Sequence, residues 1–161
     1  VDGTEMFAKA IKESKKPVVA YVSDLTAYAA YLLASQTSEI VLSGETARVG
    51  SIGTMATLRK GSSEAYITLY ASKSKRKNKA YTDAMNGDTE TYVKNVLDPL
   101  NDVFIDAVMS GRGDKIDVQK EDVTEGDIYF GSNAVKVGLA DKIGNLDYAI
   151  KRAYALSKTI R

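Results

Sequence analysis

The sequence of 161 residues contains no cysteine and no histidine. Without cysteine, the chain has no disulfide framework and no thiolate metal site. Without histidine, it has no Ser-His-Asp triad, no Cys-His dyad and no imidazole metal ligand. Nucleophilic chemistry would have to use serine, threonine or tyrosine, with lysine or a carboxylate as the base. We therefore expect neither a metal ion nor a cofactor.

The chain also lacks a long apolar run and a strong overall charge. No stretch approaches the ~20 apolar residues of a membrane span, and no basic and then apolar signal peptide opens the sequence. The net charge is +1, which argues against nucleic acid as a partner of the chain as a whole. Five of the 22 basic residues lie in one segment, so the rest of the chain has 17 basic and 21 acidic residues. These five are Lys73, Lys75, Arg76, Lys77 and Lys79. A weaker hypothesis is that this segment binds nucleic acid in a salt-dependent manner.

Apolar patterns predict alternating strands and helices, which is typical of the α/β class with crossover connections. The predicted helices begin with residues 4–15, where Met6, Phe7, Ala10 and Ile11 form one apolar stripe, and continue with residues 25–34, 90–110, 133–137 and 146–157. The predicted strands are residues 17–22, 39–42, 65–70 and 127–130. We expect Pro99 to kink or divide the longest helix, and Gly111 to close it.

An ordered series of motifs along the chain resembles the signal peptide peptidase A family, the S49 serine peptidases, including its phage branch that processes capsid proteins. The motifs are Lys16-Pro17-Val18-Val19-Ala20, the Ala-rich segment after Asp24, Glu39-Ile40-Val41, Gly50-Ser51-Ile52-Gly53, Ser110-Gly111-Arg112-Gly113, Ile128-Tyr129-Phe130-Gly131, Gly138-Leu139-Ala140-Asp141 and Asp147-Tyr148-Ala149-Ile150. The resemblance covers essentially the whole chain. It implies an α/β fold of the crotonase and Clp-protease type, a spiral of repeated ββα units with helices packed on a mostly parallel sheet.

The resemblance also implies one S49 peptidase-like domain over residues 1–161. The glycine-rich loop that supplies the oxyanion hole in the family lies upstream of the segment that begins this chain. We therefore expect the domain to be incomplete at its N-terminal side, and a targeting or membrane segment could precede it.

The family reaction is peptide-bond hydrolysis by a Ser/Lys dyad, and the resemblance places Tyr28 at the nucleophile position where serine is expected. A bulky phenol would fill the cleft that a peptide carbonyl must enter, so we expect this chain to be inactive as a peptidase. Ser23, Thr26 and Ser35 flank this position and could act as displaced nucleophiles, although Ser23 and Thr26 are more typical of helix caps.

The lysine base of the family aligns with Lys75. The alignment does not fix which basic residue between Lys73 and Lys79 takes this position. Such a lysine must be largely neutral to accept a proton, which burial achieves. A solvated loop is the alternative interpretation of this segment. Gly50 and Gly53 match a structural turn in the family and not an oxyanion hole.

Two hypotheses follow for the function. The first is an active S49 serine peptidase in which Tyr28 is a local peculiarity. The second is a pseudopeptidase that keeps the fold for peptide binding or assembly, for example as a phage structural or capsid-maturation component. Both predict a peptide or protein partner, and the ten tyrosines together with the fold family predict a homo-oligomer.

Overall fold

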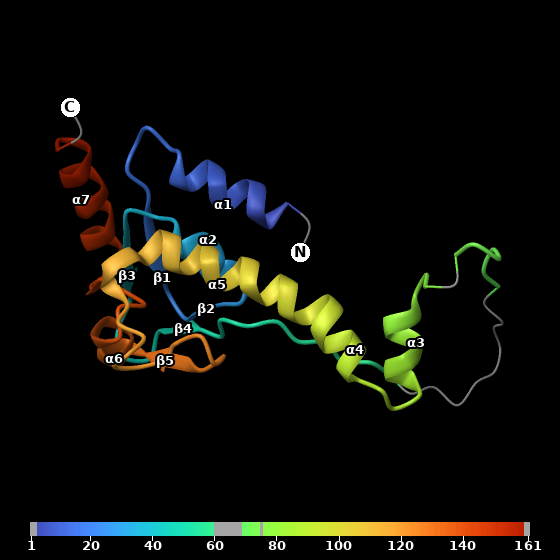
Figure 1. Cartoon of the computed structure of the whole chain (residues 1–161). Helices are drawn as coiled ribbons and strands as arrows, with labels where there is room; N and C mark the ends of the chain where they lie inside the picture. The colour runs from blue at the N-terminus through green and yellow to red at the C-terminus, as the bar shows by residue number, and fades with distance from the viewer. Residues whose placement is uncertain (1–2, 60–68, 75, 160–161) are drawn as a thin grey trace. The chain divides into compact units, whose positions relative to one another are not determined.

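The computed structural model describes residues 3–59, 69–74 and 76–159. The chain divides into two compact units (Figure 1). Unit 1 combines Val1–Gly53 with Phe104–Arg161, and unit 2 is Thr54–Val103. Each unit is described by itself below.

Unit 1 holds both sheets that the structure describes, and helices accompany them. Its elements are α1 (Thr4–Lys12), β1 (Val19–Val22), β2 (Leu25–Ala27), α2 (Ala29–Ser35), β3 (Glu39–Leu42), β4 (Arg48–Gly50), the C-terminal part of α5 (Asp98–Arg112), the 3-10 helix η2 (Gly113–Lys115), β5 (Ile128–Phe130), α6 (Gly131–Lys136), β6 (Lys142–Ile143) and α7 (Leu146–Ser157).

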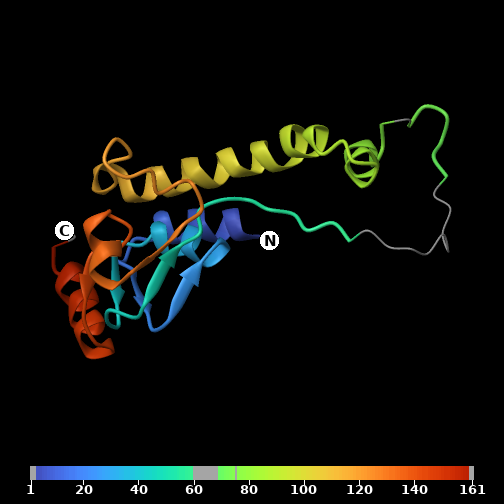
Figure 2. The same cartoon turned by 90° about the horizontal axis from the view of Figure 1, so that it is seen from below.

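The strands form two three-stranded sheets of mostly parallel pairing. The first sheet has the order β1-β3-β6, and all of its pairs are parallel. In the second sheet, of order β2-β4-β5, β2 runs parallel to β4 and β5 is antiparallel to β4. Figure 2 shows the strands side by side with helices around them. The predicted α/β class with a mostly parallel sheet is confirmed.

The core of unit 1 lies between these strands and the helices α2, α5 and α6. All four residues of β3 are buried, as expected for a central parallel strand covered on both faces. Tyr31 of α2, Val108 of α5 and Leu139 are fully buried in the same cluster. This core fixes the junction between β2 and α2.

Two boundaries predicted from the sequence are wrong. Residues 25–34 do not form one helix, because Leu25–Ala27 is a strand that pairs with β4 and the helix begins only at Ala29. The long helix does not close at Gly111 but continues through Arg112, and Gly113 then takes the left-handed conformation at φ 55°.

The apolar stripe predicted for the first helix is not its buried face. Met6 and Phe7 are 78% and 57% exposed, and the buried residue of α1 is Ala8. A small side chain on the buried face allows α1 to pack closely on α2.

Unit 2 contains α3 (Lys79–Met85), α4 (Glu90–Tyr92), the π-helical segment η1 (Val93–Leu97) and the first turns of α5. Pro99 lies in the first turn of α5, directly after η1. Proline has no N–H to donate to the preceding turn, which accounts for the division of the predicted helix into these segments. Helix α3 was not predicted. Of the predicted strand 65–70, residues 65–68 lie outside the described part, and Leu69 and Tyr70 belong to no strand.

Candidate active site

The most unusual backbone conformation at the candidate site belongs to Tyr28, which joins β2 to α2. We call residues Ala27–Ala29 the elbow. Tyr28 has φ 53° and ψ −132°, a combination that costs a bulky residue about 1–3 kcal/mol. Its side chain is half exposed. A strained turn between a strand and a helix that holds a side chain outward is also how other hydrolase folds present a nucleophile.

The elbow exposes backbone donors as well as the phenol. The first hydrogen bond of α2 runs from the N–H of Leu32 to the carbonyl of Tyr28 at 3.0 Å. The N–H groups of Ala29 and Ala30 therefore precede the helical ladder, and Tyr28 offers them no side-chain cap. The elbow combines an outward side chain with the positive end of a helix.

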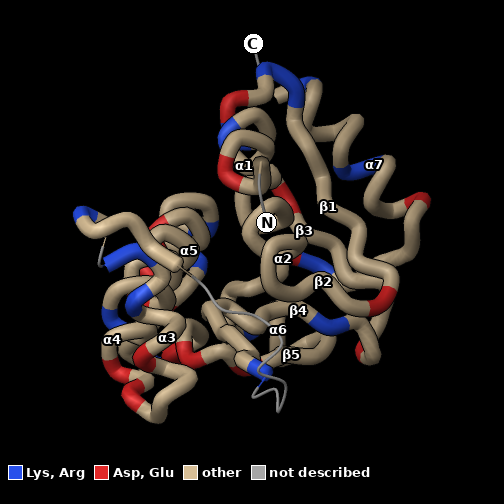
Figure 3. Tube along the Cα trace, turned by 90° about the vertical axis from the view of Figure 1, so that its right-hand side faces the viewer, with Lys and Arg blue, Asp and Glu red and all other residues tan. Residues whose placement is uncertain are grey.

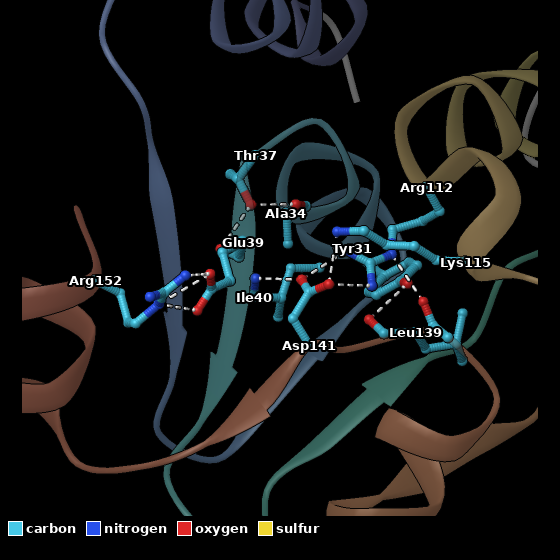
Figure 4. Close-up of polar contacts among 11 residues, drawn as sticks. Tyr31, Ala34, Thr37, Glu39, Ile40, Arg112, Lys115, Leu139, Asp141 and Arg152 are labelled. Carbon is cyan, nitrogen blue, oxygen red and sulfur yellow. Dashed lines mark hydrogen bonds and ion pairs between the residues drawn. The ribbon is translucent and has the colours of Figure 1, made fainter. Parts of the chain in front are cut away.

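Helix α2 is held firmly by its next turns, which fixes the elbow. The Tyr31 hydroxyl, fully buried, donates to the carbonyl of Leu139 at 2.9 Å (Figure 4). Burial raises the pKa of the Tyr31 hydroxyl far above its ordinary value, so this residue stays a neutral donor. At the other end of α2, the Gln36 amide donates to Ser35 and to the carbonyl of Ala107.

A buried ionic cluster lies beside Tyr31 and joins the end of α5 to the start of β6. Asp141 accepts hydrogen bonds from Arg112 at 2.9 and 3.2 Å, from Lys115 at 2.6 Å and from the N–H of Ile40 at 2.7 Å. Arg112 is almost fully buried and also donates from Nε to the carbonyl of Gly138 at 2.8 Å. Burial alone would raise the pKa of Asp141, but the hydrogen bonds from Arg112 and Lys115 hold that pKa below its ordinary value. Because every member has partners, the cluster anchors the fold and leaves no free acid or base.

The serine and threonine residues considered as displaced nucleophiles have less suitable surroundings. Ser35 is fully buried and donates its hydroxyl to the carbonyl of Leu32 at 2.8 Å. Thr26 lies inside β2, and Ser23 is exposed just before that strand.

The glycine turn is structural in this fold. Ser51 is buried at φ 52°, and its N–H donates to the carbonyl of Asp127 at 2.7 Å. Gly50 has φ 121°, and a Cβ there would approach the same carbonyl to 2.5 Å. These contacts join β4 to β5 and offer no donors to a ligand.

The predicted base, Lys75, lies outside the described residues, so the structure does not test its position. Its neighbours Lys73 and Lys77 are exposed in unit 2. Tyr28 belongs to unit 1. Within the described ranges, no group of three or more acidic side chains could hold a metal ion. In the same ranges, no helix is long and apolar enough to cross a membrane.

Sequence reasoning did not identify Tyr31, Arg112 or Asp141 as residues that support the site. Arg112 and Asp141 were noted as parts of separate motifs, but 29 positions separate them along the chain. Each of the two motifs carries a charged residue among apolar ones, and a buried charge needs a partner of opposite sign. This pattern could have indicated that Arg112 and Asp141 form a pair.

Comparisons with known proteins agree with the fold. The model of the family described as "Peptidase family S49" matches residues 10–159. A candidate protease of Methanocaldococcus jannaschii is 29% identical over 98% of this chain and 52% of its own length. The capsid assembly protease C of Escherichia phage lambda is 32% identical over 84% of this chain and 31% of its own length. The chain thus spans about half of the first relative and about a third of the second.

Solved structures show the same architecture at low identity. The 1510-N membrane-bound stomatin-specific protease, solved as a mutant with a substrate peptide, matches with a TM-score of 0.55 at 15% identity, over 95% of this chain and 59% of that one. A candidate enoyl-CoA hydratase/isomerase (crotonase) of Legionella pneumophila matches with a TM-score of 0.51 at 13% identity, over 97% of this chain and 43% of that one. The fold is therefore an α/β domain of the crotonase type. Within that class, the chain belongs to peptidase family S49.

Proposed function

We propose that this chain is a non-catalytic member of the S49 family that binds a peptide or protein segment without cutting it. The observation that carries the proposal is the elbow, where a half-exposed tyrosine occupies a strained position at the start of α2. The family resemblance assigns that position to the serine nucleophile.

The phenol is poorly suited to replace the serine. It extends well beyond the reach of a serine hydroxyl, so it occupies the space that a peptide carbonyl would need in order to approach the elbow. Steric exclusion therefore argues against acyl transfer at Tyr28.

The surroundings of the elbow support binding as a function. Within the described residues, the N–H groups of Ala29 and Ala30 precede the helical ladder, β2 lies at the edge of its sheet, and Tyr31 anchors α2 in the core. A peptide-binding domain can use all three features. Peptide binding therefore needs no change in the fold.

The alternative is an active peptidase with a displaced nucleophile. Ser35 is too deeply buried for this role. Ser23 and Thr26 remain candidates, although neither lies at the start of a helix.

A second candidate function is assembly, as a capsid-maturation or structural component. The observation that favours it is the match to the capsid assembly protease C of phage lambda, at 32% identity. An assembly role would also accommodate the homo-oligomer predicted from the sequence.

Tyr28→Ser in the full-length protein tests the proposal. We expect a fluorophosphonate to label residue 28 in this variant and to leave the wild-type protein unlabelled, because the elbow would then hold a serine at the helix start. Intact-mass analysis and peptide mapping measure the adduct. Adding Lys75→Ala should remove the label if Lys75 is the base.

Tyr28→Ala is the matched control, since it removes the phenol without adding a hydroxyl. It should remain unlabelled. Labelling of the wild-type protein as strongly as Tyr28→Ser would contradict the non-catalytic proposal.

A further inference from the structure

The turn that follows α3 contains the one Asn-Gly pair of the sequence, Asn86-Gly87. Asn86 is the exposed C-cap residue of α3, and Gly87 follows it with φ 101°. Neither the candidate active site nor the S49 motifs include these two residues. An asparagine before glycine is chemically labile, because the glycine nitrogen can attack the side-chain carbonyl carbon and close a five-membered ring.

The absence of a side chain at position 87 favours this attack. Gly87 has no Cβ, and even an added Cβ there would meet nothing within 4 Å. Any other residue places its own side chain beside the attacking nitrogen. Each of the other five asparagines is followed by such a residue, namely Lys79, Val96, Asp102, Ala134 or Leu146. The sequence therefore favours ring closure at Asn86 over all of them.

The folded turn restrains the reaction. The N–H of Gly87 donates to the carbonyl of Ala84 at 3.1 Å, and ψ of Asn86 is 3°. This conformation holds the Gly87 nitrogen away from Asn86 Cγ. The ring therefore closes only after the last turn of α3 has opened.

Helix α3 is suited to such an opening. It has seven residues, and Ala84 is the buried residue among them. A short helix has little stability of its own, and a segment with few buried apolar contacts opens at a low cost in free energy. The Asn86-Gly87 turn is therefore restrained but not locked.

From these features, we propose that Asn86 is a site of spontaneous deamidation. The nitrogen of Gly87 gives up its proton to the solvent and bonds to Asn86 Cγ, the Cγ–Nδ2 bond breaks, and Nδ2 takes up a proton and leaves as ammonia. Water then opens the resulting succinimide at either of its two carbonyls. Position 86 becomes aspartate or isoaspartate, and the reaction needs no reactant other than water.

The product places a negative charge where α3 tolerates it poorly. The C-terminal end of a helix already carries a partial negative charge. Asp83 lies three positions earlier, at neighbouring distance on the helix surface, and Asp88 lies two positions later. Figure 3 shows the acidic positions that gather along α3 and α4. Deamidation therefore weakens the end of α3.

The test is incubation of the full-length protein, folded or unfolded in guanidinium, at neutral and at alkaline pH, followed by chymotryptic peptide mapping. Asn78 is the internal control, because it is also exposed and lies at the other end of α3, but precedes a lysine. Cleavage after Tyr81 places Asn78 and Asn86 in different peptides. Mass spectrometry with electron-transfer fragmentation distinguishes aspartate from isoaspartate.

We expect both products at Asn86, formed at least about tenfold faster than any product at Asn78. The rate should rise with pH, because the Gly87 nitrogen must lose its proton. It should be lower in the folded than in the unfolded protein, because opening precedes ring closure. Asn86→Gln should remain unmodified, since its longer side chain would have to close a six-membered ring.

Hydrogen exchange at the Gly87 amide measures the structural consequence. After correction for intrinsic rates, Asn86→Asp should exchange about two- to fivefold faster than the wild type, because its charge opposes the helix dipole. Asn86→Gln is the uncharged matched control and should exchange like the wild type.

Equal rates at Asn86 and Asn78, aspartate without isoaspartate, or no product at Asn86 in either the folded or the unfolded protein would overturn the inference. A folded protein that reacts as fast as the unfolded chain would contradict the opening step. Unchanged exchange in Asn86→Asp would contradict the weakening of α3.

Discussion

Gly138→Ala is expected to cost at least about 4 kcal/mol of unfolding free energy, which is a large part of the ~5–15 kcal/mol that stabilises a typical domain. Gly138 has φ 83°, and a Cβ there would lie 1.8 Å from the carbonyl oxygen of Lys115. The Lys115 carbonyl belongs to the backbone, so it cannot move away by a change of rotamer. The carbonyl of Gly138 also accepts the hydrogen bond from Arg112, so any shift disturbs the buried cluster. Urea denaturation followed by circular dichroism measures the loss.

Gly113→Ala is the control for backbone strain alone. Gly113 also has a positive φ, at 55°, but a Cβ there meets nothing within 4 Å. The left-handed conformation by itself costs about 1–2 kcal/mol. Equal losses for the two variants would contradict the close approach of Gly138 to Lys115.

Asp141→Asn is expected to destabilise the protein by about 3–5 kcal/mol, because it leaves the Arg112 guanidinium buried without its counter-charge. The exposed pair of Arg48 with Asp24, at 2.7 Å, provides the comparison. Asp24→Asn should change the stability by at most about 1 kcal/mol, since solvent screens exposed ion pairs. Similar losses for the two variants would show that Asp141 is not a buried anchor.

The pH dependence of unfolding gives a second readout for Asp141. Its pKa in the folded protein lies below the ordinary value of 3.8, so its contribution is complete above that value and is lost as the pH falls through the lower folded pKa. As the pH falls, the wild type should therefore lose more unfolding free energy than Asp141→Asn, which has no such carboxylate to protonate. An equal loss in the two proteins would contradict the assignment.

Much of the fold could be predicted from the sequence because buried parallel strands are short, continuous apolar runs. Residues 40–42, directly after Glu39, are such a run, and all four residues of β3 are buried. The segment 25–34 was harder, because Leu25, Ala27 and the residues of α2 are all compatible with an apolar helix. Only the pairing of Leu25–Ala27 with β4 separates strand from helix, and that contact is not visible in local sequence.

The candidate site could be predicted only in part for the same reason. The motif series located Tyr28, and the structure places it between a strand and a helix. The cluster of Arg112, Lys115 and Asp141 depends on contacts between distant segments, and local periodicity contains no information about them. Helix α3 has only seven residues, which is too short for a helical period to be recognised in the sequence.

The non-catalytic assignment is tested most directly by incubating the full-length wild-type protein with a proteome-derived peptide mixture and with a fluorophosphonate. Mass spectrometry then reports new peptide termini and adduct positions. The account predicts no cleavage above buffer and no adduct on any residue. Cleavage together with an adduct on Tyr28, Ser23, Thr26 or Ser35 would contradict it and identify the nucleophile of an active S49 peptidase.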